Sequence, residues 1–485
     1  MYIKQVWENS PSTRSPINSA RLNHLETQYD QAVVESLIQA KQYVDNALIG
    51  GATSGVVRVS DFVAPQGGAV DVSDGVQLAL NAAGGQLPVV FETGGVYGVS
   101  KPLILPAGQK VLGSGATIAM MEGSGTGFAM TNFSLEDVTT PGYEGSSGIS
   151  VMDLIFDGQG TSISRRVNLL TFNHCRDIRV INCRFIRSRG YHALEFNAVN
   201  GALAEGCSFE GFVTMGLTPK EAIQVDCGTP GSIDSGLRDG TMSRNVDIRN
   251  CRFSGLGALP AHEVGVGSHA RSVGNFYDNV NVESCYFEGH TVAGVQGLAW
   301  RASSVRASQF INCAIGAQLK TSETSTISNC SYKGAGTQAF VLSDSSIRCS
   351  VESFNAEGAG EGVLVSTLSE GCTVSSGRTY RTSGFGIVVA GGSDTFIPGC
   401  AVFGAGDGPS SALTAAIRIT ASLGATARNA VTGCIVRPHG VSGTPEPLSS
   451  VSSQASATDT WVFGNDFRGM ASATAGTVNT TSNRI

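Results

Sequence analysis

The sequence has few charged residues, no basic run and no long apolar run. Charged side chains make up 15% of the 485 residues, and the formal net charge at pH 7 is −7. Proteins that bind nucleic acids usually carry a concentrated basic surface, so we expect no nucleic acid partner. No stretch approaches the roughly 20 consecutive apolar residues of a membrane span, so membrane insertion is not expected. The start, MYIKQVWENSPSTRSP, lacks the order of charged, apolar and small residues that marks a signal peptide.

Proline is scarce and glycine is abundant, at 15 and 62 residues. This balance predicts many turns and few long helices. Apolar residues make up 41% of the chain, which is enough to bury a long core. The length suits two or three ordinary domains or one elongated repeat structure.

The 12 cysteines recur in one short pattern. The phrases INCRF, EGCSF, RNCRF, ESCYF and SNCSY begin at residues 181, 205, 249, 283 and 328. In each phrase an aromatic side chain follows the cysteine by two, which places both on the same face of a strand. We therefore predict reduced cysteines in the core, where they act as small apolar residues, rather than disulfides or metal ligands.

The N-terminal region has helical periodicity. Apolar residues recur at steps of three and four from Leu22 to Leu48, which predicts one long helix within a leader segment, residues 1–51. Such a helix is consistent with a parallel oligomeric bundle, or with a single helix packed on its own protein. A second, short helix is predicted near 74–83, capped by Ser73 or Asp74 and ending at Ala83.

Short strands recur from about residue 110 to about residue 436. One family of apolar strands begins at residues 192, 222, 264, 294, 316, 339, 362, 386 and 415. Several of these steps are 22–24 residues long, and a fixed period of this size indicates stacked coils rather than hairpins. We predict an all-β right-handed parallel β-helix over residues 52–439. Residues 440–485 are predicted to form a linker and a C-terminal capping coil, which would protect the open end of the helix.

The chain resembles bacteriophage tail spikes of the pectate-lyase-like β-helix type. The start, SPINSARLNHLETQYDQA, looks like the leader of phage tail proteins, and the segment from DVSDGVQLALNAAGG to LILPAGQKVLGSGATI is similar to the first coils of such spikes. The closing VFGNDFRG resembles their last coil. The resemblance implies a homotrimer in the virion tail that binds a host surface glycan and often cleaves it. It also implies that the N-terminal segment attaches the spike to other tail or baseplate proteins.

The segment KEAIQVD, residues 220–226, places several polar groups on one predicted strand. If Leu194 and Phe196 align with Ile223 and Val225 and with Val264 and Val266, the polar residues form columns on neighbouring coils. The predicted columns are His192, Glu221 and His262; Glu195, Gln224 and Gly265; and Asn197, Asp226 and Gly267. The last two columns are expected to point outward, with the glycines leaving a bare floor that suits a sugar ring.

Two carboxylates in these columns have the spacing of a glycoside hydrolase pair. Glu195 and Asp226 are offset by one coil and two residues, which predicts about 8 Å between their Cα atoms. A hydrolase needs one protonated acid and one carboxylate, about 6.5–9.5 Å apart in inverting enzymes. We predict Glu195 and Asp226 as the catalytic pair, with Glu221 as a substitute for either. Polar outward columns are also common as solvated ladders, and Asp226 could simply begin the turn into the insert 227–241.

Seven further residues are predicted to bind the substrate: His192, Asn197, Gln224, His262, Glu263, His269 and Gln296. No metal or other cofactor is expected, since no close ligand spacing resembles a zinc site. The predicted function is hydrolysis of a host polysaccharide or a teichoic-acid-like polymer. Two alternatives remain: a receptor-binding spike without catalysis, and a lyase that uses Lys220, Arg301 or Lys320 for charge neutralisation and proton abstraction.

Overall fold

The structure is a computed structural model of residues 1–485, and part of the chain is described below. The described residues are 55–216, 220–229, 236–269, 274–406, 415–438, 449–454, 457–470, 472, 474–476 and 479–481. The predicted leader and helix, residues 1–51, lie outside this part of the chain, and so do residues 440–448 of the predicted linker.

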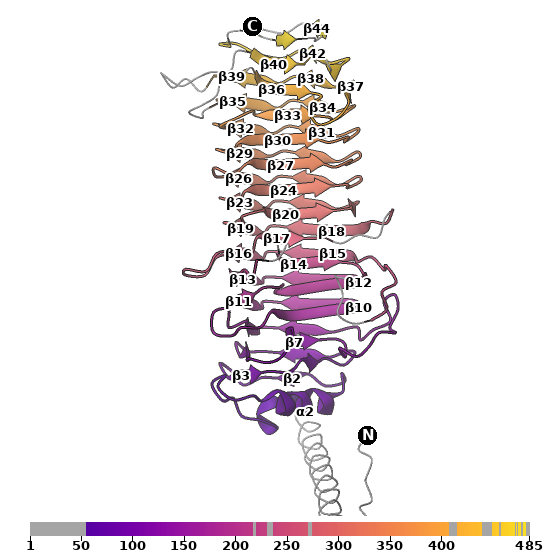
Figure 1. Ribbon diagram of the computed structural model, residues 1–485, viewed down its shortest axis with the longest axis vertical. Helices are drawn as coiled ribbons and strands as arrows, with labels where there is room; N and C mark the ends of the chain where they lie inside the picture. Colours follow the sequence, from indigo (N-terminus) through magenta and orange to yellow (C-terminus); the bar gives the residue numbers. More distant parts are fainter. Residues whose placement is uncertain are drawn as a thin grey trace, which may run out of the picture.

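The chain forms a right-handed parallel β-helix, as predicted. Figure 1 shows coils stacked along one axis, with a helix at the N-terminal end of the stack and the last strands at the other end. Strands one coil apart pair in parallel, as β12 (Leu194–Glu205) does with β14 (Glu221–Asp226). Two large sheets result, and the larger one supplies two of the three columns of strands that surround the core.

The first column carries the residues of interest. Its strands are β4 (Leu103–Ile104), β7 (Gly127–Thr131), β10 (Val167–Ile181), β12, β14, β17 (Val264–Gly267), β20 (Ala293–Leu298), β24 (Ile315–Lys320), β27 (Gln338–Ser343), β30 (Glu361–Ser366), β33 (Ile387–Ala390), β36 (Ala415–Thr420), β40 (Ser449–Ser453) and β43 (Thr474–Gly476).

The second column continues the same sheet around a corner, and the long strands β10 and β12 pass through that corner. Its other strands are β1 (Val57–Arg58), β2 (Val89–Val90), β5 (Lys110–Leu112), β8 (Ser150–Met152), β15 (Arg244–Arg249), β18 (Tyr277–Glu283), β21 (Trp300–Arg301), β22 (Ser304–Arg306), β25 (Thr326–Ser328), β28 (Ser350–Glu352), β31 (Thr373–Ser375), β34 (Phe396–Pro398), β38 (Ala430–Thr432), β42 (Trp461–Phe463) and β44 (Asn479–Thr481).

The third column is the 13-stranded sheet. It contains β3 (Val96–Val99), β6 (Thr117–Met120), β9 (Ile155–Asp157), β11 (Arg184–Arg189), β13 (Ser208–Val213), β16 (Arg252–Ser254), β19 (Tyr286–Glu288), β23 (Gln309–Ile311), β26 (Ser331–Lys333), β29 (Asn355–Glu357), β32 (Arg378–Tyr380), β35 (Ala401–Phe403) and β39 (Ile435–Arg437). A small two-stranded sheet joins β37 (Thr426–Ala427) to β41 (Ala457–Thr458).

The cysteine pattern marks the corner between the second and third columns. Asn182, Asn250 and Asn329 each precede a cysteine and have φ values of 52°, 54° and 54°. Asparagine tolerates this left-handed conformation better than most residues, so it turns the chain sharply between the two strands. All twelve cysteines are buried free thiols, as predicted for core residues.

Aromatic rings stack in the core from coil to coil. Phe185, Phe209, Phe253 and Phe287 form successive stacked pairs with centroid separations of 4.8, 4.8 and 4.6 Å. These separations match the spacing of neighbouring strands, because identical positions on successive coils lie one strand apart. The stack is what the repeated cysteine-x-aromatic phrase predicts.

The helix α2 (Ser73–Ala83) lies against the first coil and covers its end (Figure 1). Its buried face includes Val76, Ala79 and Leu80, which continue the core. The predicted cap is wrong in detail. Neither Ser73 nor Asp74 caps the helix through its side chain; Asp71 accepts the Ser73 backbone N–H at 3.0 Å.

The last described strands extend the columns. In the segment predicted to form a cap, β40 pairs with β43, and β42 pairs with β38 and β44. The region therefore adds strands to the same solenoid. In the part of the chain that the structure describes, no helix has the length and apolar character needed to cross a membrane.

Candidate functional site

The polar columns lie where β10, β12, β14 and β17 stack in the first column. The register of β12 and β14 is the predicted one, with Leu194 opposite Ile223, Glu195 opposite Gln224 and Asn197 opposite Asp226. Glu195 and Asp226 therefore have the predicted offset of one coil and two residues.

The predicted register of the next strand is wrong by two residues. Ile223 lies opposite Val266 rather than Val264, and Gln224 lies opposite Gly267. A two-residue shift still places a valine, Val266, on the core side opposite Ile223, so the apolar alternation alone cannot detect it. The shift brings His269, in place of Gly267, beside Asp226.

The shift also removes His262 from its predicted column with His192 and Glu221. Its ring stacks on Phe212 at a centroid distance of 4.5 Å, and its backbone oxygen accepts a hydrogen bond from His290 Nδ1 at 2.7 Å. Burial lowers the pKa of His262 to about 3, so it is neutral near pH 7. We exclude it from the candidate site.

The predicted bare floor is only half correct. A side chain at Gly265 would point inward and meet the Phe287 ring at 2.6 Å, so this glycine serves core packing. A side chain at Gly267 would meet Glu221 Cγ at 3.0 Å, so this glycine makes room for a residue of the site. Gly267 lies between Gln224 and Gln296 in one column that continues to Gln318.

The outward carboxylates are buried rather than lining an open groove. The exposed fractions of Glu195, Glu221 and Asp226 are 3%, 1% and 0%. Sequence alternation predicts which face of a strand a residue occupies, but it does not predict what covers that face. A different residue, His269, is the exposed member of the group, with 31% of its side chain accessible.

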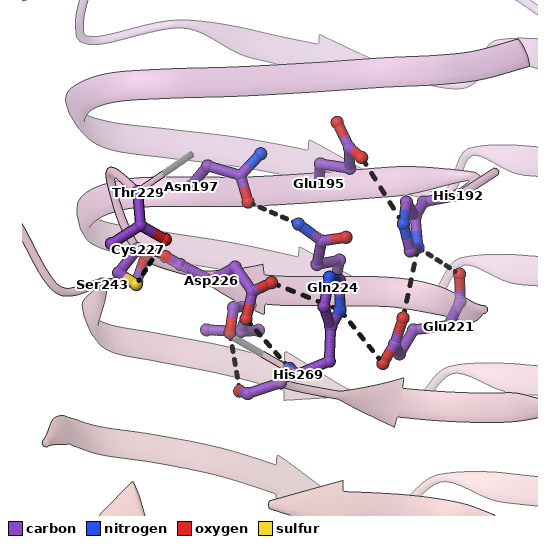
Figure 2. A network of polar contacts seen from close by, with 12 residues as sticks. His192, Glu195, Asn197, Glu221, Gln224, Asp226, Cys227, Thr229, Ser243 and His269 are labelled. Carbon is purple, nitrogen blue, oxygen red and sulfur yellow. Dashed lines mark hydrogen bonds and ion pairs between the residues drawn. The ribbon is translucent and has the colours of Figure 1, made fainter. Parts of the chain in front are cut away.

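The imidazole of His269 joins two carboxylates from β14 (Figure 2). Its Nδ1 lies 3.3 Å from Asp226 Oδ2 and 3.5 Å from Glu221 Oε1. Its backbone N–H donates to Asp226 Oδ1 at 3.1 Å. Burial opposes the charged form of the ring, but the hydrogen bond to Glu221 and the charges of Asp226 and Glu221 outweigh burial and raise the pKa of His269 to about 9. His269 is therefore a cation at neutral pH.

A second imidazole, His192, has the opposite protonation preference. Its Nδ1 lies 3.0 Å from the backbone oxygen of Glu221, so this nitrogen is the donor, and Nε2 lies 3.8 Å from Glu195 Oε1. Burial is the main cause that holds the pKa of His192 well below its usual range, and nearby Lys220 lowers it further. The cluster thus contains one cationic and one neutral histidine, stacked with centroids 6.0 Å apart.

Hydrogen bonds between coils fix the other polar groups. Thr171 Oγ1 donates to Glu195 Oε2 at 2.8 Å. Gln224 Nε2 donates to Asn197 Oδ1 at 2.9 Å, and Asn197 Nδ2 donates to Asn173 Oδ1 at 3.2 Å. These amides bind one another across coils, so Asn173, Asn197 and Gln224 tie β10, β12 and β14 together.

Buried groups behind β14 support Asp226. The Tyr277 hydroxyl lies 3.2 Å from Asp226 Oδ1, and Ser243 Oγ donates to the Asp226 backbone oxygen at 2.6 Å. Trp300 Nε1 donates to Ser268 Oγ at 2.9 Å, which fixes the residue before His269. The carboxylate is therefore locked at the point where the chain leaves the strand.

Glu263, predicted to bind the substrate, directly precedes β17. Its carboxylate accepts the Lys220 backbone N–H at 2.9 Å and faces Thr214 Oγ1 at 3.4 Å. It therefore anchors the segment before β14, outside the group around His269. The predicted insert 227–241 packs through its described part on the loop after β7, where Gly236 N–H donates to the Asp137 backbone oxygen at 2.7 Å.

Sequence reasoning missed four residues next to the site: Arg166, Thr171, Asn173 and Tyr191. A signal for two of them was available, because LTFN at 170–173 repeats LEFN at 194–197 at the same position of the preceding coil. Arg166 and Tyr191 occupy no column and left no such signal. Among the described residues, no group of three or more histidine, cysteine, aspartate or glutamate side chains is arranged to hold a metal ion.

Comparison with solved structures places the chain among right-handed parallel β-helix proteins. It is similar to PfbA, a surface adhesin of Streptococcus pneumoniae (TM-score 0.58, 18% identity), over 70% of this chain and 89% of that chain. It is also similar to a mutant tailspike protein of the E. coli bacteriophage HK620 in complex with a hexasaccharide (TM-score 0.56, 11% identity), over 88% and 79% of the two chains.

A third similar structure is tailspike protein 3 of bacteriophage CBA120, with a TM-score of 0.54 and 11% identity. The match covers 90% of this chain and 62% of that chain. No protein-family model and no curated protein matches the sequence. At these identities the likeness establishes the fold and not the chemistry.

Proposed function

We propose that this protein is a phage tail spike that binds a glycan of the host cell surface and hydrolyses it at the cluster around His269. The observation that carries the proposal is the meeting of Glu195, Glu221 and Asp226 with two histidines across successive coils. Two similar folds belong to phage tailspikes, and one of these binds a hexasaccharide. We further propose a homotrimer in the virion tail, attached through residues 1–51 to other tail or baseplate proteins.

The two carboxylates of the proposed catalytic pair have a suitable offset. Glu195 and Asp226 are one coil and two residues apart, which corresponds to about 8 Å between Cα atoms. Inverting glycoside hydrolases separate their carboxyl groups by about 6.5–9.5 Å, which leaves room for the attacking water. For direct action by these two carboxyl groups, the Cα offset corresponds to inversion rather than to the shorter gap of a retaining enzyme.

Asp226 works through His269 in this proposal. The carboxylate is fully buried, whereas the imidazole that it holds is accessible and cationic at neutral pH. The protonated ring can give its proton to the oxygen of the leaving sugar, and Asp226 stabilises the cation before transfer. Glu195 then acts as the base that takes a proton from water. Glu221 is the alternative partner of the ring, at 3.5 Å from its Nδ1.

Three substitutions test these roles. In Glu195→Gln, Asp226→Asn and His269→Gln, release of fragments from purified host envelope polymer should fall by about 10²–10⁴-fold, the usual contribution of a general acid or base. The matched control is Glu288→Gln, whose carboxylate lies on β19 in the third column and pairs with Arg252. Wild-type rates in all three site variants would refute the assignment.

Binding without cleavage is the second candidate function. The burial of Glu195, Glu221 and Asp226 favours it, because a buried carboxylate does not reach a sugar directly. A spike of this type would retain the polymer on the protein and release it at its original length. A lyase is the third candidate, and its unsaturated product would show as new ultraviolet absorbance during digestion.

A further inference from the structure

Two cations lie against the ring of Tyr191, next to the candidate site. The guanidinium carbon of Arg166 is 5.4 Å from the ring centroid, and Lys220 Nζ is 5.2 Å from it. Arg166 also donates from Nη1 to the Tyr191 hydroxyl at 3.1 Å. Each contact is within the range of a cation–π interaction, so the ring holds both positive groups close together.

Neither cation has a carboxylate partner among the described residues. Other cations of this chain commonly do, as shown by the pairs Arg184–Glu210, Arg301–Asp278 and Arg428–Asp394. Lys220 is also largely buried, with 9% of its surface exposed. Two neighbouring positive charges repel each other, and the carboxylates of Glu221 and Asp226 in the adjoining site contact His269 rather than these cations. In a chain with net charge −7, two neighbouring cations without such an ion pair are a candidate site for an anionic ligand.

The cations are continuous with the site. The Tyr191 ring stacks on His192 at a centroid distance of 6.3 Å, and His192 stacks on His269 at 6.0 Å. Lys220 directly precedes Glu221, and its charge is felt by both histidines. The stacked rings of Tyr191, His192 and His269 thus connect the two cations to the proposed catalytic cluster.

We propose that Arg166, Tyr191 and Lys220 form a subsite for an anionic group, a carboxylate or a phosphate, carried by the glycan. Arginine offers a planar pair of donors that matches either anion, and lysine adds a compact charge with three donors. The face of Tyr191 offers a flat surface beside them. The assignment of the ligand to a glycan rests on the proposed function. The subsite itself rests on two neighbouring cations that form no ion pair with a carboxylate of the described residues.

The experiment measures anion binding by the full-length protein with carbon-13-labelled tyrosine and histidine. Sodium D-glucuronate and D-glucose 1-phosphate are the anionic probes, and methyl D-glucoside is the neutral one. We expect saturable shifts of the Tyr191 ring signals with an anionic probe and none with the neutral sugar. Saturation by glucuronate alone identifies a carboxylate subsite, and saturation by the phosphate ester alone identifies a phosphate subsite.

Variants link the shifts to the two cations. Lys220→Met and Arg166→Gln should each weaken anion binding by about tenfold or more, while Lys220→Arg should retain it. Lys333→Met, which removes an exposed lysine paired with Glu357, should bind like the wild type. Melting temperatures of all variants identify any that fail to fold, and Lys220→Arg preserves the positive charge of the side chain.

Two results would overturn the subsite. One is no saturable shift with either anion, or equal shifts with the neutral sugar. The other is wild-type affinity in the folded Lys220→Met and Arg166→Gln variants. Failure of the proposed function gives a different pattern, in which the anions bind at Tyr191 but no envelope polymer is bound or cleaved.

Discussion

His269 Nδ1 lies 3.3 Å from Asp226 Oδ2, and the backbone N–H of His269 donates to the other oxygen of the same carboxylate at 3.1 Å. The ring and the backbone of one residue are thus both fixed by Asp226. The carboxylate is in turn held by the Tyr277 hydroxyl at 3.2 Å. This pair gives the site an accessible cation with a buried counter-charge.

Asp226→Asn should lower the pKa of His269 from about 9 toward the ordinary value near 6.5. The substitution removes a neighbouring negative charge, while burial, which disfavours the charged ring, remains. The measurement is a titration of the His269 Cε1–H signal by NMR. Asp278→Asn is the control, because that aspartate pairs with Arg301 on β21. An unchanged pKa of His269 in Asp226→Asn would show that the pair does not set its charge.

Stability should fall as the pH rises from about 6.5 to about 9. The folded pKa of His269 is above its unfolded value, so its contribution is complete below about 6.5 and disappears as the pH passes about 9. The difference between the folded and unfolded pKa of His269 corresponds to about 1–3 kcal/mol of stability after allowance for solvent screening of the partly exposed ring. His269→Gln should flatten the profile in this window, as measured by chemical denaturation at fixed pH values. A profile as steep as that of the wild type would exclude His269 as its cause.

Alanine substitutions at Gly265 and Gly267 should affect different properties of the protein. Gly265→Ala places a methyl group 2.6 Å from the Phe287 ring, so we expect a loss of about 1–3 kcal/mol of stability from overpacking. Gly267→Ala meets the flexible Glu221 side chain at 3.0 Å, so it should displace that carboxylate and change the pKa of His269 with less loss of stability. Denaturation and the histidine titration, applied to both variants, check the contrast. Equal effects of the two variants on both measurements would contradict it.

The cysteines should be unreactive in the folded protein. All twelve are buried, and burial raises the pKa of Cys313 and Cys372 to about 11 and that of Cys330 to about 12. Because the thiolate is the reactive form, a reagent such as DTNB should label the native chain very slowly and all twelve thiols after unfolding. Rapid labelling of several thiols under native conditions would contradict the core packing described above.

The fold could be predicted from the sequence because its coils repeat. The phrase around Cys183, Cys207 and Cys251 marks one corner in successive coils, and period-two alternation gives the inward residues on either side. The same periodicity fixed Glu195 beside Gln224 and Asn197 beside Asp226, where neighbouring strands carry similar apolar pairs.

The site could be predicted only in part. Periodicity does not distinguish the true register of β17 from one shifted by two residues, so it predicts His262 beside Glu221 and does not predict His269 beside Asp226. Burial of the outward carboxylates depends on the side chains packed around them, such as His192 and His269, and alternation along one strand does not predict that packing. The contact of Arg166 and Lys220 with Tyr191 joins residues from three coils, and it arises only after the solenoid has formed.

The most direct test of the central claim is mass spectrometry of fragments released from host envelope glycans that the protein binds. We predict hydrolytic fragments, each gaining one water per cleavage, with the wild type and with Glu288→Gln. Their release should fall by about 10²–10⁴-fold with Glu195→Gln and with Asp226→Asn. Glycan that is bound but stays at its original length, or equal release by the site variants, would contradict the claim that this cluster hydrolyses the glycan.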